Sequence, residues 1–583
     1  MLLLLLLALQ EKPTRLPSTD LKQRVIWGTV CEDGPGLAFG GQDQEAPDGN
    51  PHTRVKVDGQ WKAIEWPGKR PDGAEIRQAR QALARARFDF FEGRGEAPAV
   101  VKLRQALEAV ERELEARDVE PAPRALTAIA WDAKSKLYVL FGGDHFDYLT
   151  NDTWVFDPAV PKWTLRRPPS APPPRANHAL TAVDGKITLK GGYTYTSSTD
   201  YVGGQYRNLA DGEWTYDVEA NAWSGAGVAP DTRVYRTGRL HPDHFLVPPA
   251  GEPLGALPAN EWVSMKPPKL PAMNRDWGTA VYDPDRQLIL RWSGGHSAHG
   301  GTDVLQYHTN TNRWELTMPV EFPLGQTYSN TEYPEGVNFN RRPWVTGHTY
   351  QSYGYDPIGK KMHFLGRKSD GHVWDPDLGD WTARYPKPKE LVYGDCFYTL
   401  TITSTPSGLV CWTKDGKLFR YESTWMLRNI NGTLPGSVVD NSTLAYDAKR
   451  DRLLFWRKGY GDKNPYDGEI QAVDKDGVVS ALNPEGKAAA VAVPYLCQIR
   501  YDVANDLFLV GGTVEGRTPA YDPEKNRWVT LKIGGEDPSG KKGRNVSLGM
   551  MYDAKRKLFW AVDTNSHVYV LRLDPATADL RPL

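Results

Sequence analysis

The 583-residue chain is poor in cysteine, has no excess of charge of one sign, and has no long hydrophobic run after its first residues. Four cysteines are too few for a disulfide scaffold; Cys396 and Cys411 could pair across one hairpin, and four buried thiols explain the count equally well. Lys and Arg total 71 against 72 for Asp and Glu, so the net charge predicts no nucleic acid partner. No later apolar stretch is long enough to cross a bilayer, so we expect no stable membrane insertion.

Sequence signatures of several enzyme classes are also missing. The chain has no P-loop, nucleophile elbow, dinucleotide-binding fingerprint or HExxH pattern. Acidic residues are scarce where functional loops are expected, with Asp144, Asp276 and Asp395 as the main candidates. This scarcity disfavours a glycosidase, which needs paired carboxylates.

The first ten residues, MLLLLLLALQ, contain an apolar run from Leu2 to Leu9. The run is too short to span a membrane and is typical of the hydrophobic part of a secretory signal, although no Lys or Arg precedes it. We expect residues 1–10 to be a signal peptide and the protein to be periplasmic or secreted.

Turn-forming and aromatic residues are abundant, with 55 Gly, 45 Pro, 27 Tyr and 20 Trp, which is typical of many short strands. A hairpin with an aromatic-Asp turn recurs along the chain, as in AWDAKSKLYVLFGG from Ala130 and VYDPDRQLILRWSGG from Val281. A second hairpin follows each of these, and its last strand opens with Trp, as at Trp163 and Trp528. Two hairpins make a four-stranded antiparallel unit of about 45 residues, and the recurring aromatic residues are expected to pack within it.

The double glycine after the second strand and the aromatic residue before the fourth resemble kelch repeats, the type found in the central domain of galactose oxidase. The resemblance covers nearly the whole chain and implies an all-β, kelch-like β-propeller, but it implies little about activity. Nine candidate units open near Arg24, Arg124, Arg175, Arg275, His348, Tyr393, Asp440, Pro494 and Arg544. Because propellers typically close with roughly four to eight blades, we predict one ring over residues 24–583 with eight blades, within a range of seven to nine.

Three long segments connect the fourth strand of one unit to the first strand of the next. They span residues 65–123, 225–270 and 315–347, and the topology places them on one face with the loops between second and third strands. The first predicts a helical hairpin, because EIRQARQALARARFDFFEG and AVVKLRQALEAVERELEAR have helical periodicity. The other two are predicted to be loop insertions that fence a cleft on the same face.

Basic and aromatic residues gather on this predicted face, where the loop SGGHSAHGGTDV carries two histidines between glycine pairs. The candidate catalytic residues are His145, His178, Tyr193, Arg275, His296 and His348. The candidate substrate-binding residues are Tyr148, Arg175, Arg236, Trp277, Arg342, Trp344, Arg367, Arg457, Tyr460 and Arg544. A divalent metal on His296 and His299 is not favoured, because the loop lacks the Cys or acidic companions of a recognisable metal signature.

Convergent guanidinium, imidazole and phenol groups suit a carbohydrate, above all an anionic polysaccharide, because guanidinium binds carboxylate or sulfate and aromatic faces stack on sugar rings. The same groups could perform β-elimination on a uronate, so a polysaccharide lyase is the leading catalytic option, and whether the ligand is turned over stays open. The alternative is a non-catalytic scaffold that binds a protein partner. A copper radical oxidase is disfavoured, because the only adjacent Tyr-His pair, Tyr307 and His308, falls on the opposite side of its unit.

Overall fold

The computed structural model describes residues 25–26, 28–40, 42–43, 53–64, 66, 74–115, 120–122, 124, 126–144, 148–195, 206–230, 232–235, 253–268, 278–292, 304–317, 338–339, 342–343, 349–366, 370–391, 400–437, 442–457, 470–486, 499–511, 516–538 and 549–583. Within these ranges the protein is all-β apart from two α-helices and two short 3-10 helices, Leu254–Ala256 and Lys389–Leu391. Nine sheets of four or five strands form its bulk. This architecture confirms the all-β part of the prediction and is compatible with a β-propeller.

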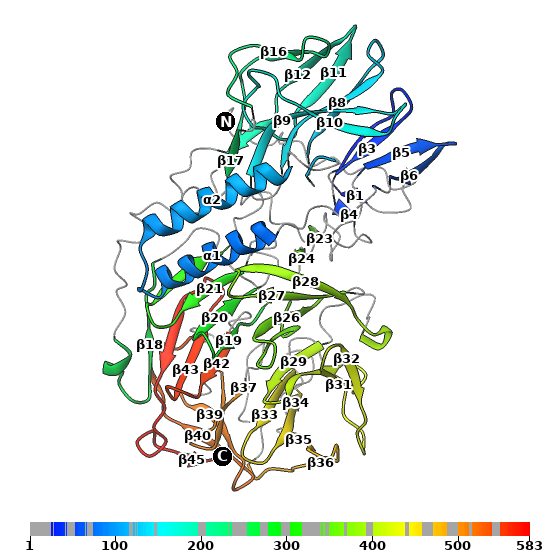
Figure 1. Ribbon diagram of the computed structural model, residues 1–583. Helices are drawn as coiled ribbons and strands as arrows, with labels where there is room; N and C mark the ends of the chain where they lie inside the picture. Colours follow the sequence, from blue (N-terminus) through cyan, green and yellow to red (C-terminus); the bar gives the residue numbers. More distant parts are fainter. Residues whose placement is uncertain are drawn as a thin grey trace, which may run out of the picture.

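Three sheets from the N-terminal part of the chain lie together at one end of the molecule (Figure 1). We call them the N-terminal group, and their strands are β2 (Thr29–Cys31), β3 (Leu37–Phe39), β5 (Thr53–Val57) and β6 (Gln60–Ala63); β7 (Ala128–Asp132), β8 (Leu137–Asp144), β9 (Tyr148–Asp157) and β10 (Lys162–Arg166); and β11 (Ala179–Val183), β12 (Lys186–Lys190), β15 (Glu213–Asp217) and β16 (Ala222–Ser224). The inner strand β7 contacts both β2 and β11, so the sheet of β7 lies between the other two.

Six sheets form a second group, the C-terminal group (Figure 1). Their strands are β19 (Val281–Asp283), β20 (Leu288–Arg291), β21 (Leu305–His308) and β22 (Arg313–Leu316); β25 (Tyr353–Asp356), β26 (Lys361–Leu365), β27 (Asp370–Asp375) and β28 (Asp380–Pro386); β29 (Leu400–Thr405), β30 (Gly408–Thr413), β31 (Leu418–Tyr421) and β32 (Trp425–Arg428); β33 (Ser442–Asp447), β34 (Arg452–Arg457), β35 (Ile470–Asp474) and β36 (Val479–Ala481); β37 (Ile499–Asp502), β38 (Leu507–Val510), β39 (Thr518–Asp522), β40 (Arg527–Leu531) and β45 (Arg581–Pro582); and β42 (Gly549–Asp553), β43 (Leu558–Val562), β44 (Val568–Leu571), β18 (Glu261–Ser264) and β41 (Gly534–Gly535).

Further short strands lie near the connections. Strand β17 (Arg233–Tyr235) pairs with the start of β9, and β13 (Tyr193–Tyr195) pairs with β14 (Tyr206–Asn208). Two further pairs are β1 (Val25–Ile26) with β4 (Gln42–Asp43) and β23 (Asn338–Phe339) with β24 (Arg342–Pro343). The segment 225–270 therefore contains two strands, β17 and β18, where a loop insertion is expected from the sequence.

The inner strands of the C-terminal group contact one another in a cyclic order. Strand β19 contacts β25, the contacts continue through β29, β33, β37 and β42, and β42 contacts β19 again. The last sheet takes its outer strand from earlier in the chain, because β18 pairs with β44 and places Trp262 opposite Leu571. The nine units read from the sequence are present as nine sheets. The predicted single ring of eight blades is not confirmed, because the sheets contact one another as a group of three and a group of six.

The recurring Asp of the first hairpin builds its turn. Asp283 and Asp502 each accept hydrogen bonds from the backbone N–H groups two and three residues later, which is an Asx turn. Four residues after each Asp, Gln287 and Asp506 adopt positive φ angles of 59° and 55° and close the hairpin. Tyr501 Oη also donates to Asp506 Oδ1 at 2.7 Å. The aromatic-Asp motif therefore encodes a turn, as the repeat predicts.

The Trp that opens the last strand of a unit is buried in the core. This holds for Trp163, Trp223, Trp314, Trp381, Trp425 and Trp528. In the N-terminal group these indoles also join neighbouring sheets: Trp163 Nε1 donates to Thr53 Oγ1 at 2.8 Å, and Trp223 Nε1 donates to Thr153 Oγ1 at 3.0 Å. The interpretation of these residues as packing groups is confirmed.

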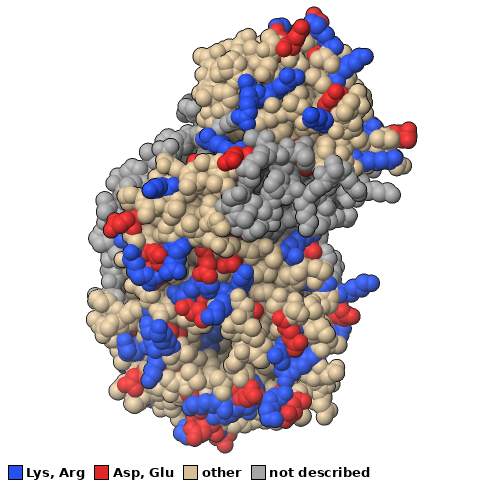
Figure 2. Space-filling view, viewed as in Figure 1, with Lys and Arg blue, Asp and Glu red and all other residues tan. Residues whose placement is uncertain are grey.

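The two predicted helices are present as α1 (Ala74–Phe91) and α2 (Ala97–Glu115), which contact each other and lie between the two groups of sheets (Figure 1). None of the described helices has the length and hydrophobicity of a membrane span. Cys31 and Cys411 are buried free thiols, and the other two cysteines lie outside the described residues. On the face seen in Figure 2, basic and acidic side chains are interspersed, in keeping with the balanced composition.

Candidate functional site

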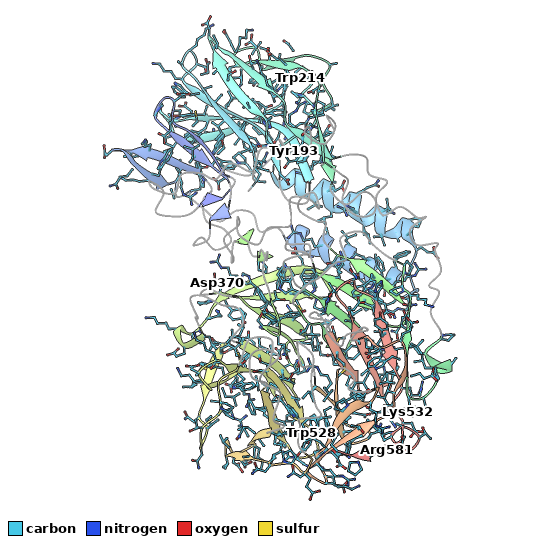
Figure 3. The ribbon with its side chains drawn as sticks, turned by 180° about the vertical axis from the view of Figure 1, so that it is seen from behind. Tyr193, Trp214, Asp370, Trp528, Lys532 and Arg581 are labelled. Carbon is cyan, nitrogen blue, oxygen red and sulfur yellow. The ribbon has the colours of Figure 1, made fainter. Side chains whose placement is uncertain are left out.

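Most of the site residues proposed from the sequence lie outside the described residues. These are His145, Arg236, Arg275, Trp277, His296, His299, Trp344, His348, Arg367, Tyr460 and Arg544. Tyr148, Arg342 and Arg457 lie in strands β9, β24 and β34. The side chains of Arg175, His178 and Tyr193 are described, and all three belong to the N-terminal group; Figure 3 labels Tyr193 there, far from Asp370 of the C-terminal group. The convergence of His145, His296 and His348 that the sequence predicts stays a prediction.

Arg175 precedes β11 and is fully buried. Its guanidinium donates to the carbonyl oxygens of Pro173 and Gly191, at 3.1 and 2.9 Å, and forms an ion pair with Asp211. Asp211 also accepts a hydrogen bond from Trp214 Nε1 at 2.8 Å. Through these contacts Arg175 fixes the start of β11 to the adjacent strands. Because its side chain is fully buried, it has no exposed surface that a substrate could contact.

Arg124 makes the same arrangement one sheet earlier. It donates to the carbonyl oxygens of Ala122 and Gly142, at 2.9 and 3.2 Å, and to Asp152 Oδ1 at 2.5 Å. Trp154 Nε1 donates to the second oxygen of Asp152 at 2.7 Å. Because the same Arg-Asp-Trp arrangement recurs in successive sheets, it belongs to the construction of the repeat.

His178 packs edge-on against Phe141, with ring centroids 5.5 Å apart. Among the described residues neither of its ring nitrogens has a hydrogen-bond partner. Burial, followed by the positive charge of Arg175, lowers the pKa of His178 to about 3, against a smaller opposing effect of the Phe141 backbone. An imidazole with so low a pKa is a weak proton acceptor at neutral pH, so His178 is poorly suited to act as a general base.

The second residue of the double glycine that follows the second strand, Gly192, is required by this packing. A Cβ atom on Gly192 would lie 2.9 Å from the Cβ of His178 and 2.8 Å from the carbonyl oxygen of Ala176, and Gly192 has a φ of +90°. Only glycine adopts this conformation without strain at such close approach. Tyr193, the next residue, forms a backbone bridge to Ala176 and is 9% exposed. The predicted loop site at this position is therefore a close-packed junction of two sheets.

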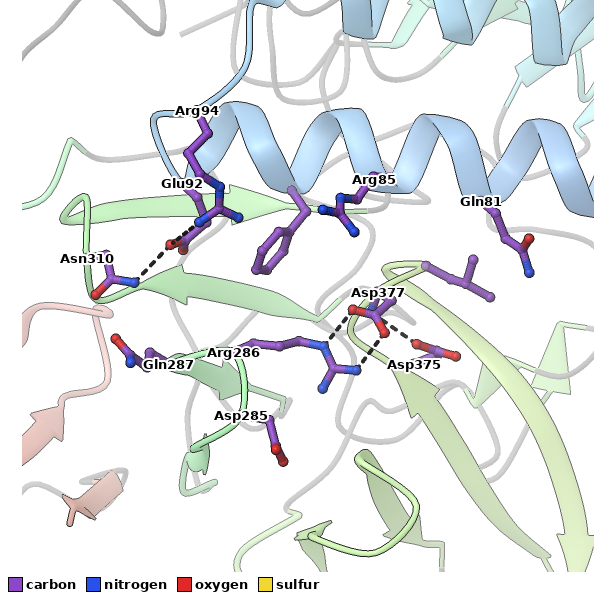
Figure 4. A pocket seen from close by; sticks show the side chains of 12 residues that line it. Gln81, Arg85, Glu92, Arg94, Asp285, Arg286, Gln287, Asn310, Asp375 and Asp377 are labelled. Carbon is purple, nitrogen blue, oxygen red and sulfur yellow. Dashed lines mark hydrogen bonds and ion pairs between the residues drawn. The ribbon is translucent and has the colours of Figure 1, made fainter. Parts of the chain in front are cut away.

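A cavity of about 620 Å³, which we call the α1 cleft, lies between α1 and three turns of the C-terminal group (Figure 4). The helical side supplies Gln81, Arg85, Phe88 and Glu92, spaced by four, three and four residues, followed by Arg94. The turns supply Asp285, Arg286 and Gln287 after β19, Asn310 after β21, and Asp377 and Leu378 after β27, and Asp375 is the last residue of β27. The sequence signal that could have found this cleft is the stripe of polar residues on α1.

Ion pairs and hydrogen bonds fix the carboxylates of the α1 cleft. Arg286 donates to both oxygens of Asp377 at 2.6 Å (Figure 4), and this contact lowers the pKa of Asp377. Burial raises the pKa of Asp285, but a hydrogen bond from Tyr355 Oη at 2.7 Å and an ion pair with Lys360 outweigh it, so the net shift is downward. The carboxylates thus present ionised acceptors of fixed position.

The end of α1 is attached to β21 and β22 by buried charges and by aromatic rings. Burial raises the pKa of Glu92, but hydrogen bonds from His308 and Asn310 lower it further than burial raises it. The rings of Phe88 and Phe91 pack on the His308 imidazole, with centroids 5.5 and 5.4 Å apart. These contacts set the width of the α1 cleft.

The position of α1 corrects the face expected from the sequence. The helical hairpin is predicted beside the loops that join second and third strands. In the structure, Arg87 of α1 donates to the carbonyl oxygen of Leu378, and the carbonyl oxygen of Phe91 accepts from Thr311 Oγ1 at 2.6 Å. Both partners lie in turns that join third and fourth strands, at the opposite end of their sheets. The helix lies at this end of the sheets because it carries the partners of His308: the rings of Phe88 and Phe91 lie in the last turns of α1, and Glu92 follows it directly.

No sequence-family model matches the chain, and no curated protein sequence matches it significantly. Among the described ranges, no group of three or more His, Cys, Asp or Glu side chains is arranged to hold a metal ion. The loop with His296 and His299 lies outside these ranges. The geometry of the α1 cleft therefore carries the functional argument.

Proposed function

We propose that this is an exported protein that binds carbohydrate in the α1 cleft. The observation that carries the proposal is the lining, in which guanidinium, carboxylate and amide groups from α1 and three separate turns surround one cavity together with the ring of Phe88. Sugar hydroxyls both donate and accept hydrogen bonds, so they need donors and acceptors side by side. An aromatic ring on the wall adds a surface on which the apolar face of a sugar can stack.

The charges of the α1 cleft favour an uncharged sugar over a polyanion. Three arginines face four carboxylates, and Arg286 is held by Asp377 and Asp283. An anionic polysaccharide would meet repulsion from the carboxylates that remain. The anionic ligand expected from the sequence depends on a set of arginines and histidines, most of which lie outside the described residues. We therefore propose a neutral oligosaccharide as the ligand of this cleft.

Binding is a better fit to the cleft than hydrolysis. A glycosidase needs one carboxyl group whose pKa is raised, so that it can act as a general acid. Glu92, Asp285 and Asp377 instead have lowered pKa values, for the reasons given above. They are suited to accept hydrogen bonds from sugar hydroxyls.

For the scaffold, we propose a kelch-like propeller in which the six sheets of the C-terminal group are blades of one ring. The cyclic contacts of the inner strands support it, as does the pairing of β18 with β44, which joins the start of the group to its end. A ring of blades gives every sheet two neighbours, and it presents turns at the rim where a helix can rest.

The proposal is tested by titrating the full-length protein with neutral oligosaccharides selected on a glycan array that also carries uronate and sulfated polymers. Arg85 is 79% exposed and pairs with Asp89 on the same helix, so Arg85→Ala leaves the core intact. We expect this variant to weaken binding about tenfold, as loss of one charged hydrogen bond does.

The matched control is Arg104→Ala, which removes an ion pair of the same spacing, with Glu108, from α2. It should bind like the unmodified protein. Equal affinity of all three proteins would exclude the α1 cleft as the site. Binding only to uronate polymers, with a rise in ultraviolet absorbance from unsaturated ends, would replace the proposal with the lyase.

A further inference from the structure

His308, the last residue of β21, is fully buried and bound on both sides by carboxylates. Its Nδ1 lies 2.7 Å from Glu92 Oε1, and its Nε2 lies 2.8 Å from Glu315 Oε2. Glu315 lies on β22, whereas Glu92 follows α1 directly, more than two hundred positions earlier in the chain. One imidazole therefore joins the helix to the sheet.

The two contacts require two protons on the ring. A neutral imidazole has one N–H group and one lone pair, so it satisfies only one ionised carboxylate; the imidazolium ion has two N–H groups and satisfies both. Arg87 pairs with Glu315, and Asn310 Nδ2 donates to Glu92 Oε2 at 2.9 Å. These partners stabilise the ionised form of each carboxylate.

We infer that His308 is a positioning residue that holds the end of α1 on the sheet only while its imidazole carries both protons, so that pH regulates the α1 cleft. The regulatory part rests on the proposed function, because Glu92 lines the cleft. Removing one proton leaves a carboxylate facing a lone pair. Glu92 is the group released, because Glu315 keeps the contact with Arg87 and is buried within the sheet.

The surrounding charges agree with this assignment. Burial lowers the pKa of His308, but hydrogen bonds and charges of Glu315 and Glu92 raise it above the ordinary value of 6.5. Burial raises the pKa of Glu315, but the charge of Arg87 and the His308 contact bring it below 4.5. The other charged groups near this cluster are Arg94 beyond α1, Arg313 on β22 and Arg556, which reaches Thr309 and Asn310 from the turn after β42. Arginine stays charged over the whole range and does not titrate with His308.

The sign of the pH effect follows from these shifts. Because the pKa of His308 is raised, the histidine contributes stability that is fully present below pH 6.5. This contribution is lost as the pH rises through the pKa of His308 in the folded protein. The lowered pKa values of Glu92 and Glu315 contribute stability that is complete above 4.5 and is lost as pH falls through their folded-state values. Docking of α1 on the sheet is therefore strongest between pH 4.5 and pH 6.5, and it weakens at lower and at higher pH.

The test is hydrogen–deuterium exchange of α1 amides in the full-length protein, at about pH 5.5 and about pH 9, corrected for the intrinsic pH dependence of exchange. We expect α1 to exchange at least about tenfold faster at the higher pH, a change that corresponds to one pKa unit of coupling. Glu92→Gln should keep α1 protected at both pH values, because an amide N–H can donate to the lone pair of a neutral ring.

Two further variants complete the experiment. His308→Gln should expose α1 at both pH values. His567→Gln is the control, because His567 also binds a carboxylate, Asp563, at 2.9 Å, but lies outside the contact with α1; it should behave like the unmodified protein. Two results would overturn the inference. The first is an α1 exchange rate in the unmodified protein that is the same at both pH values, and the second is a Glu92→Gln variant whose α1 exchange rate still rises fully with pH. No sugar is used, so failure here is distinct from failure of the proposed carbohydrate binding.

Discussion

The third sheet of the N-terminal group differs from the sheets of the C-terminal group in how many of its faces are buried. In the third N-terminal sheet, β11 alternates between exposed and half-buried residues, and β12 alternates as well. In the C-terminal group, β20, β30, β38 and β43 are buried along their whole length. The middle N-terminal sheet behaves like the C-terminal ones, since β8 is buried at all but its first residue. A sheet at the end of a row has one neighbour, and a sheet inside a row or ring has two, which accounts for the exposed face of the third sheet. The first sheet also lies at an end, but its short strand β3 is buried throughout.

Two of the buried histidines, His178 in the N-terminal group and His308 in the C-terminal group, have opposite surroundings. His178 has no partner for its ring nitrogens among the described residues, and its pKa is lowered. His308 has a carboxylate on each nitrogen, and its pKa is raised. Burial alone therefore does not determine the charge of a histidine; the groups facing the two nitrogens decide it.

The largest expected effect comes from the core of the C-terminal group. Trp381→Ala removes a fully buried indole that packs on Trp292 and Trp374. We expect the free energy of unfolding in urea to fall by about 3–5 kcal/mol. The control is Met426→Ala on β32, where the side chain is 53% exposed, with an expected change within about 0.5 kcal/mol. Similar losses in the two variants would contradict the burial of both faces.

The Arg-Asp pairs of the N-terminal group should come next. Arg124→Ala leaves Asp152 buried at 3% exposure without its cation, and we expect a loss of about 3 kcal/mol in urea unfolding. Arg175→Ala should cost less, because Asp211 is 24% exposed and water can replace the guanidinium. A larger loss for Arg175→Ala than for Arg124→Ala would show that exposure of the acid does not set the cost.

The pH dependence of stability separates the two histidines. In the unfolded chain His178 takes up a proton below pH 6.5, but in the folded protein it does so only near pH 3. The folded protein therefore loses stability as the pH falls from 6.5 to 3. The loss is about 1.4 kcal/mol per pH unit. His178→Leu should flatten the measured slope of unfolding free energy against pH in this range. An identical slope in both proteins would mean that the pKa of His178 is the same in the folded and unfolded states.

The smallest effect is expected on the open face of the third sheet. Val183 ends β11 and is 74% exposed, so Val183→Ser should change the free energy of unfolding by less than about 0.5 kcal/mol. Thermal unfolding of the purified variant is a sufficient measurement. A clear loss of stability would indicate that this face is covered in the native protein, and the difference between the two groups would then be smaller than the strand patterns suggest.

Local features of the fold could be predicted from particular residues. The aromatic-Asp turns, the buried Trp of the last strand and the two helices all follow from spacing over a few residues. The candidate site could be predicted much less well. Arg175 and His178 have the residue types of a catalytic site, but their partners, Asp211 and Phe141, are 36 and 37 positions away, and they turn both residues into packing groups. The sequence does not reveal the α1 cleft because its walls come from segments about two to three hundred residues apart.

The sequence by itself determined the repeating four-stranded unit, because hydrophobic alternation, Asx turns and close-packed glycines act within a few residues of one another. Only the tertiary structure decided which sheets are neighbours, that β18 completes the sheet of β44, and that α1 rests on β21 and β22. Equivalent strands in a repeat have nearly equal local preferences, so the choice among them depends on long-range contacts such as that of Glu92 with His308. Those contacts also place the cleft to which we assign the function.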